Sequence, residues 1–162
     1  IGAFGILSRQ DTVIALSLCG AMAGFAWFNR PVARLFLGDV GSLPIGLLLG
    51  WLLLRLAADG HLAAALLLPL YYLADATLTL LRRLIRGEPV WHAHRTHFYQ
   101  LATDRGFTVA GVVASVFAVN VALCALALLI VIWPSRNVEF AALAGGIVLV
   151  GCELFAFARG RR

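Results

Sequence analysis

The chain contains no lysine and few charged residues of any kind, since only 13% of its 162 residues are Asp, Glu or Arg. Hydrophobic residues make up 62% of the sequence and the mean hydropathy is +0.93. A soluble domain of this length does not bury that much apolar surface. The scarcity of charge therefore excludes an ordinary soluble domain and indicates that a lipid bilayer covers part of the chain.

Cysteine is also scarce, and the spacing of the three cysteines excludes two further classes. Cys19, Cys124 and Cys152 fall within apolar segments, far apart in the sequence. This spacing is neither that of a metal-binding cluster nor that of a disulfide framework. We interpret the three residues as small core or lipid-facing side chains.

Long apolar runs are what the sequence has in abundance. About twenty apolar residues cross a bilayer as a helix. Five such segments can be drawn, at residues 12–28, 42–58, 62–81, 107–133 and 138–157. We therefore predict an all-α integral membrane protein, with a single transmembrane domain over residues 1–162 and about five transmembrane helices.

The arginines predict the orientation of these helices. The net charge of +5 does not indicate a nucleic-acid partner, because the arginines lie between apolar segments rather than on one basic face. One side of the membrane receives residues 29–41, residues 82–106 and the tail. This side holds Arg30, Arg34, Arg82, Arg83, Arg86, Arg95, Arg105, Arg159, Arg161 and Arg162, and the other holds Arg9, Arg55 and Arg136. Arginine-rich loops stay inside, so we predict that residues 29–41 and 82–106 are cytoplasmic loops of a multi-pass plasma-membrane protein.

The first of these loops ends in the run Phe36-Leu37-Gly38-Asp39-Val40-Gly41-Ser42. We expect a membrane helix to begin here, with Ser42 as its N-cap and Pro44 in its first turn. A helix N-terminus attracts phosphate, but a carboxylate beside it repels phosphate unless a cation lies between them. Mg²⁺ is commonly held by one or two carboxylates together with phosphate oxygens. The run predicts a metal–diphosphate site, and the equally weighted alternative is that Asp39 merely charges a helix start.

The second loop carries three histidines and an arginine within the run Trp91-His92-Ala93-His94-Arg95-Thr96-His97-Phe98-Tyr99-Gln100. A zinc site is one interpretation, although the usual second ligand cluster is missing. A clamp for phosphate or sugar fits better, because His and Arg donate hydrogen bonds to phosphate oxygens. The third interpretation is an ordinary basic loop near anionic headgroups.

Two polar residues lie inside apolar segments. Asp75, Thr79 and Arg82 fall on one helix face. An ionisable residue at this depth is a functional hypothesis by default, but we favour a structural role, with Asp75 facing the bundle interior and paired with Arg82. We expect Asn120 to bridge neighbouring helices.

These motifs together resemble one known family. They are Asn29, the Phe-Leu-Gly-Asp-Val-Gly-Ser run, Asp75 with Arg82-Arg83 behind it, and His-Arg-Thr-His-Phe-Tyr-Gln at residues 94–100. The family is that of the polyprenyl-phosphate N-acetylhexosamine-1-phosphate transferases, in glycosyltransferase family 4. The resemblance covers the family's C-terminal half. The histidine loop is more similar to the O-antigen and lipopolysaccharide branch, which makes surface glycans, than to the peptidoglycan branch, whose loop has a triple histidine.

The resemblance implies an activity and its partners. Such an enzyme transfers an N-acetylated sugar 1-phosphate from a UDP-sugar, here a UDP-N-acetylhexosamine, to undecaprenyl phosphate and releases UMP. It depends on Mg²⁺, or on Mn²⁺ in its place. It works among membrane lipids at the cytoplasmic face of the bacterial inner membrane, and the resemblance is compatible with a homodimer.

The resemblance also implies roles for individual residues. Asp39 matches the aspartate that binds the metal on the nucleotide diphosphate, and Phe36 matches an aromatic residue that stacks on the uracil. Gly38 matches a position where the backbone approaches the nucleotide, and Asn29 matches an asparagine that hydrogen-bonds the base.

The histidine loop supplies the other implied residues. His94, Arg95 and His97 match the last cytoplasmic loop of the family, which recognises the diphosphate and the sugar. We therefore assign catalytic roles to Asp39, His94 and His97, and a substrate-binding role to Arg95.

One part of the family pattern is missing. The family has an acidic pair on an earlier cytoplasmic loop, and no Asp-Asp occurs in this chain, which opens on Ile1 rather than Met. We expect the chain to be part of a larger transferase and to be inactive alone. The alternative is a non-enzymatic small transporter or assembly subunit with a histidine-rich cytoplasmic loop. Transporters place charged residues near the midplane, whereas the notable polar groups here crowd the cytoplasmic ends, which favours the transferase.

Overall fold

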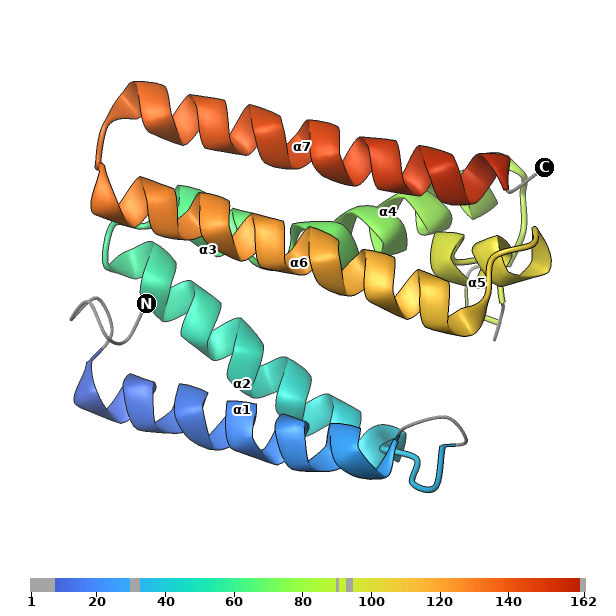
Figure 1. Ribbon diagram of the computed structural model, residues 1–162, viewed down its shortest axis with the longest axis horizontal. Helices are drawn as coiled ribbons and strands as arrows, with labels where there is room; N and C mark the ends of the chain where they lie inside the picture. Colours follow the sequence, from blue (N-terminus) through green and yellow to red (C-terminus); the bar gives the residue numbers. More distant parts are fainter. Residues whose placement is uncertain (1–7, 30–32, 90, 93–94, 161–162) are drawn as a thin grey trace. The chain divides into compact units, whose positions relative to one another are not determined.

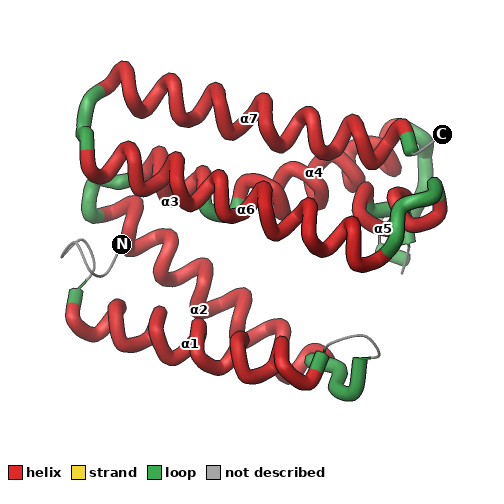
Figure 2. Tube along the Cα trace, in the orientation of Figure 1, coloured by secondary structure: helices red, strands yellow, loops and turns green. Residues whose placement is uncertain are grey.

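The computed structural model describes residues 8–29, 33–89, 91–92 and 95–160. All regular secondary structure in these ranges is helical (Figure 2). The chain divides into two compact units, Ile1–Ala65 and Leu66–Arg162.

The first unit consists of two long helices that pack against each other, α1 (Arg9–Phe28) and α2 (Gly38–Ala58) (Figure 1). Ser8 caps α1, because its hydroxyl oxygen accepts the Asp11 backbone N–H at 3.1 Å. The Asp11 carboxylate is buried and accepts a hydrogen bond from Arg55 Nε of α2 at 3.3 Å. This ion pair joins the first turn of α1 to the last turn of α2.

The second unit is a helical bundle of α4 (Leu70–Ile85), α5 (Phe98–Asp104), α6 (Val109–Ile132) and α7 (Arg136–Arg159). The helices α6 and α7 form a long antiparallel hairpin, and α4 and the short α5 pack against both of them (Figure 1). Side-chain oxygens cap the two long helices, since Thr108 accepts the Gly111 N–H at 3.1 Å and Ser135 accepts the Val138 N–H at 3.3 Å. The core of the unit is apolar and includes Leu123 and Phe157.

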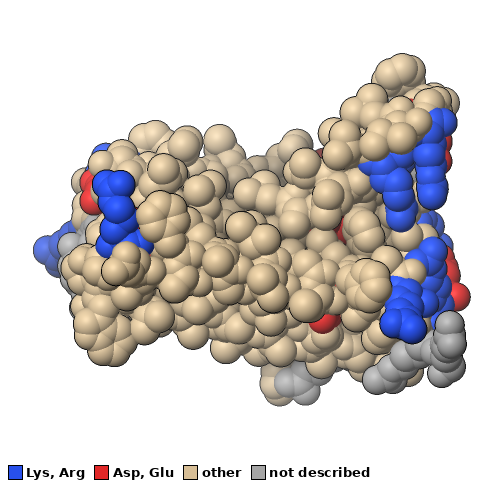
Figure 3. All heavy atoms as spheres, turned by 90° about the horizontal axis from the view of Figure 1, so that it is seen from above, with Lys and Arg blue, Asp and Glu red and all other residues tan. Residues whose placement is uncertain are grey.

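Four helices of the described chain are long and apolar enough to cross a membrane, and they confirm an all-α integral membrane protein. They are α1, α2, α6 and α7, at the positions predicted for residues 12–28, 42–58, 107–133 and 138–157. In the second unit, Arg82, Arg83 and Arg159 lie in the last turns of α4 and α7, and large stretches of the face drawn in Figure 3 carry no charged side chain. A lipid bilayer matches this distribution, because hydrocarbon accommodates apolar side chains and excludes charges.

The prediction of one continuous helix over residues 62–81 is wrong. The structure has a short helix α3 (Leu62–Leu67) and then α4, which begins at Leu70. Pro69 lies at the break, where it has no N–H to donate to the helical ladder and disfavours helical geometry at the preceding Leu68. Helix α4 continues past residue 81 to Ile85, so that Arg82 and Arg83 lie in its last turn.

Gly146 of α7 packs closely against leucine side chains of the bundle. A Cβ added there would be 2.5 Å from Leu67 Cδ2, 3.2 Å from Leu123 Cδ2 and 3.3 Å from Leu70 Cδ2. We expect Gly146→Val to lower the free energy of unfolding by about 1–3 kcal/mol, because a well-packed core does not accept added methyl groups. Thermal unfolding in detergent measures this change. Gly151→Val is the control on the same helix, since a Cβ there meets nothing within 4 Å; equal losses in the two variants would contradict the prediction.

Candidate functional site

Asp39 is the second residue of α2, and it lies on the surface. The predicted helix start was wrong by one turn: the N-cap is Leu37, which makes no side-chain capping bond, and Ser42 lies inside the helix. Pro44 is also inside the helix rather than in its first turn. The carboxylate therefore occupies the first turn itself, where the backbone N–H groups have no helical partners.

The glycine before this acid has a backbone that other residues avoid. Gly38 has a φ of +58°, in the left-handed region where a Cβ is strained. The Gly41 N–H then donates to the Leu37 carbonyl at 3.2 Å and closes the first turn. The left-handed Gly38 thus lies directly before the acid, at the point where the loop enters α2.

The residues around Asp39 present their side chains to the surroundings. Phe36 is 88% exposed, and Asn29, the C-cap of α1, is also exposed. No hydrogen bond or ion pair joins the Asp39 carboxylate to another residue in the described ranges. Carboxylate oxygens are hard ligands of the kind that Mg²⁺ takes, and this acid has no competing partner there. Asp39 therefore fits a divalent cation that also carries phosphate oxygens.

In the second unit, Asp75 of α4 binds the beginning of α5. The carboxylate is buried, with 3% of the residue exposed. Its Oδ1 accepts the Phe98 backbone N–H at 2.9 Å and the Thr79 hydroxyl at 3.1 Å, and it lies 3.5 Å from His97 Nδ1. The prediction that Asp75 faces the bundle interior is confirmed.

The predicted pairing of Asp75 with Arg82 is wrong. Arg82 Nη2 donates to the Thr96 carbonyl at 2.8 Å, and its Cζ lies 5.3 Å from the centre of the Phe98 ring. Both residues of α4 thus reach the same short segment of the loop by separate contacts. Helical spacing placed them on one face but did not reveal these partners.

Arg83 fixes the earlier part of the loop. This arginine is 5% exposed, and its Nε donates to Glu88 Oε2 at 3.1 Å. Its Nη2 donates to the Pro89 carbonyl at 2.7 Å and its Nη1 to the His92 carbonyl at 3.4 Å. One buried guanidinium therefore closes the turn that follows α4.

His97 is the N-cap of α5. Gln100 Oε1 accepts the His97 backbone N–H at 3.3 Å, and the Gln100 backbone N–H donates to the His97 carbonyl at 3.0 Å, so the two residues bond to each other at the helix start. The ring also stacks on Tyr99, with centroids 5.7 Å apart and planes inclined by 22°. The imidazole is thus held by contacts on several sides.

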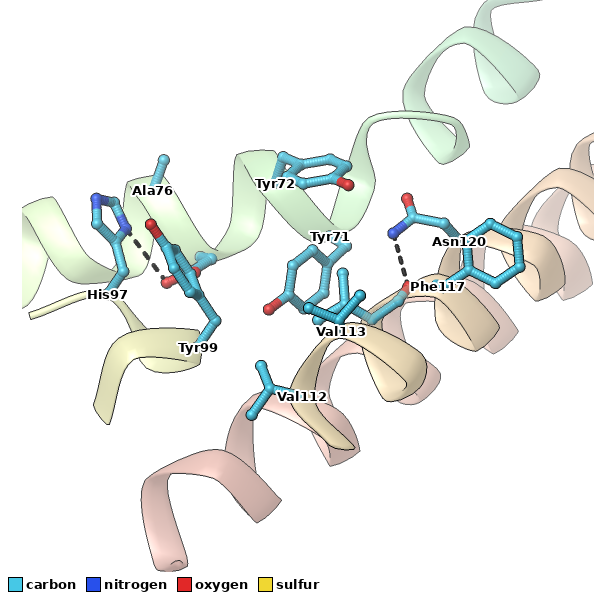
Figure 4. Close-up of a pocket in the computed structure, with 11 residues that line it drawn as sticks. Tyr71, Tyr72, Ala76, His97, Tyr99, Val112, Val113, Phe117 and Asn120 are labelled. Atoms are coloured by element: carbon cyan, nitrogen blue, oxygen red, sulfur yellow. Dashed lines mark hydrogen bonds and ion pairs between the residues drawn. The ribbon is translucent and has the colours of Figure 1, made fainter. Parts of the chain in front are cut away.

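A cavity of about 570 Å³ opens beside this histidine. Figure 4 shows His97 and Tyr99 at one end of it, Asn120 and Phe117 at the other, and Tyr71 between them. The Tyr71 hydroxyl is buried and has no hydrogen-bond partner among the described residues. Asn120 was expected to bridge helices, but the hydrogen bond that the structure gives it is to the Val116 carbonyl of its own helix, at 2.8 Å.

The predicted site residues fall in both units. Asn29, Phe36, Gly38 and Asp39 belong to the first unit. Arg95, which is exposed, and His97 belong to the second, and His94 lies outside the described residues. The structure brings His97 and Tyr99 together with Asp75 and Tyr71 at one cavity, a grouping that sequence analysis missed because the two pairs lie more than twenty residues apart in the sequence.

Within the described ranges, no three His, Cys, Asp or Glu residues gather in a way that would hold a metal ion. A cation at Asp39 would therefore take its remaining ligands from phosphate and water, as Mg²⁺ commonly does.

Comparison with protein families gives one partial match. Residues 1–57 match the family described as Glycosyl transferase family 4. The matched part contains Asn29 and the Asp39 run and ends before the histidine loop. No solved structure matches the chain.

Curated proteins named phospho-N-acetylmuramoyl-pentapeptide-transferase share a short segment with the chain. The protein from Nautilia profundicola is 49% identical over 41 residues, which are 25% of this chain and 12% of that protein. The one from Desulfovibrio desulfuricans is 54% identical over 45 residues, or 28% of this chain and 13% of that protein. The one from Granulibacter bethesdensis is 56% identical over 39 residues, or 24% and 11%. The similarity thus spans about an eighth of the length of these relatives.

We expect Arg83→Met to loosen the loop after α4. The change removes the donors to Glu88, Pro89 and His92 and leaves carbonyl groups without partners, at a cost of about 1–3 kcal/mol. Hydrogen exchange of residues 84–92 should become faster. Arg86→Met is the matched control, because Arg86 is exposed near the same helix end. Equal exchange in the two variants would show that the guanidinium does not hold the loop.

Proposed function

We propose that this chain is part of a membrane transferase of glycosyl transferase family 4, which moves an N-acetylated sugar 1-phosphate from a UDP-sugar to a polyprenyl phosphate such as undecaprenyl phosphate. The proposal assigns nucleotide and metal binding to the start of α2 in the first unit, and it assigns recognition of the diphosphate and the sugar to the histidine loop in the second unit. It places both at the cytoplasmic face of a bacterial inner membrane.

The observation that carries the proposal is the exposed Asp39 carboxylate in the first turn of α2, after the left-handed Gly38. It lies in the segment that matches the family. An acid at this place repels the phosphates that a helix start attracts. A divalent cation bound to the acid would remove this repulsion and would let the phosphates bind there. A bound Mg²⁺ supplies charge neutralisation for the diphosphate and for the leaving phosphate.

The reaction joins two anions. An oxygen of the polyprenyl phosphate attacks the β-phosphorus of the UDP-sugar, and the bond from that phosphorus to the bridging oxygen breaks. The bonding electrons leave with that oxygen on UMP. Positioning and electrostatics do most of the work in such a transfer. We assign the metal ligand to Asp39, the stacking on uracil to the exposed Phe36, and the cationic and hydrogen-bonding contacts with the diphosphate to His94, Arg95 and His97.

The cavity of the second unit supports a lipid acceptor. Most of its lining is apolar or aromatic, and His97 and Tyr99 lie at one end (Figure 4). A lipid phosphate beside His97, with its first isoprene units in the cavity, would satisfy both kinds of lining.

Two classes of uridine-nucleotide donor are compatible with the proposal. The form of the histidine loop favours a UDP-N-acetylhexosamine and the start of a surface glycan. The names of the curated relatives from Nautilia profundicola and Desulfovibrio desulfuricans refer instead to a phospho-N-acetylmuramoyl-pentapeptide, which favours a uridine nucleotide that carries that group. Turnover of both uridine nucleotides by membranes that contain the longer protein distinguishes the two donors.

We expect Asp39→Asn in the longer protein to abolish glycolipid formation while membrane insertion stays normal. The amide keeps the shape of the side chain but loses the charge that a cation needs. Transfer of labelled sugar phosphate to polyprenyl phosphate measures the effect. Asp59→Asn is the control, because Asp59 is an exposed acid at the opposite end of the same helix. Unchanged transfer in Asp39→Asn would remove the basis of the proposed function.

We expect Phe36→Ala to raise the KM for the UDP-sugar and to leave kcat nearly unchanged. Stacking of a base on an aromatic ring contributes about 1–3 kcal/mol, which corresponds to roughly a 5- to 150-fold change. Initial rates at varied donor concentration measure it. Leu35→Ala is the control for loss of an exposed apolar neighbour. A KM equal to that of the parent protein would exclude Phe36 from the nucleotide site.

A further inference from the structure

We infer that Asp75 is the positioning residue of the histidine loop: from inside the bundle, its carboxylate fixes the backbone and the ring of His97. The inference rests on the proposed function for its effect on turnover, whereas its structural part stands on the contacts alone.

The Asp75 carboxylate is buried and therefore needs partners within the protein. Asp75 is 3% exposed in a helix with apolar surroundings, where a carboxylate is costly unless its oxygens are satisfied. The basic residues nearest to it on α4 are engaged elsewhere, Arg82 with Thr96 and Phe98 and Arg83 with the segment 88–92. The contacts of Asp75 outside its own helix are therefore with the beginning of α5.

One oxygen of Asp75 contacts both the Phe98 backbone N–H and the His97 ring. Asp75 Oδ1 accepts the Phe98 backbone N–H at 2.9 Å and lies 3.5 Å from His97 Nδ1. The peptide after the histidine and the imidazole itself are thus located by the same atom. Figure 4 shows the Tyr99 ring beside the His97 imidazole, on which it stacks. Rotation of the imidazole away from the stacked ring would break the contact with Asp75.

The position of His97 matters for the proposed transfer. A group that handles a diphosphate must be held to within a fraction of an ångström, because a misplacement of about 1 Å reduces the rate on the order of 100-fold. The backbone before α5 is irregular, so contacts with neighbouring groups must supply that restraint. The buried Asp75 carboxylate on the regular helix α4 supplies a contact to the His97 ring and to the Phe98 N–H, in addition to the contact of Arg82 with Thr96. Asp75 itself touches no substrate and acts through His97.

The first test measures structure and needs no activity. In the chain as it stands, Asp75→Ala should accelerate hydrogen exchange of residues 96–100 at least tenfold and leave residues 136–159 unchanged. Because the alanine variant can fail to fold, Asp75→Asn is measured beside it and should give a smaller acceleration, since its amide oxygen can still accept the Phe98 N–H. Unchanged exchange of residues 96–100 in both variants would overturn the inference, whatever reaction the protein catalyses.

The second test is a double-mutant cycle for glycolipid formation in the longer protein. Asp75→Ala and His97→Ala should each lower kcat about 10- to 100-fold, and the double variant should be no slower than His97→Ala alone. Glu153→Ala is the control, an acid in α7 that hydrogen-bonds Ser115; any effect it has should multiply with that of His97→Ala. Multiplying effects for Asp75 and His97, or full activity in Asp75→Ala, would overturn the inference. Absence of transfer by the parent protein would instead refute the proposed function, and the exchange measurement would still decide the role of Asp75.

Discussion

The structure depends on one constraint: inside a bilayer, every backbone donor and every buried charge must find a partner within the protein. Three helices obey it at their starts, where the side chains of Ser8, Thr108 and Ser135 accept backbone N–H groups. Asp75 obeys it by accepting donors from Thr79 and Phe98. Because irregular backbone is costly in hydrocarbon, the loops with candidate chemistry are confined to helix ends. The constraint that folds the chain therefore also determines where a site can lie.

Hydropathy predicted the four long membrane helices because length and composition are enough to identify them. It failed over residues 62–81, where composition is uniformly apolar but Pro69 removes a donor from the ladder. Pro69 was visible in the sequence and was the available signal. The helix start at Asp39 was misplaced for a related reason: Ser42 satisfied a statistical preference for N-caps, whereas Gly38 could adopt the positive φ that moved the start upstream.

The sequence named candidate site residues one by one but did not reveal the contacts that they make. The polar motifs selected Asp39 and His97, the family resemblance selected Phe36, and the structure leaves Asp39 and Phe36 exposed. Helical periodicity correctly placed Asp75 in the interior, yet it named a partner seven residues away on the same helix. The actual partner is the Phe98 amide, 23 residues along the chain. Such long-range contacts depend on how the loop returns to the helix, and local periodicity carries no information about that return.

The interrupted α3–α4 pair has a consequence for how the chain can cross lipid. With 16 residues, α4 is about 24 Å long, whereas α6 and α7, with 24 residues each, are about 36 Å long. The hydrocarbon of a bilayer is about 30 Å thick, so α4 alone is too short to cross it, and α4 is not among the four helices of the described chain that are long and apolar enough to do so. The break at Pro69 therefore leaves residues 62–85 able to match the hydrocarbon only as two joined helices, not as one rod.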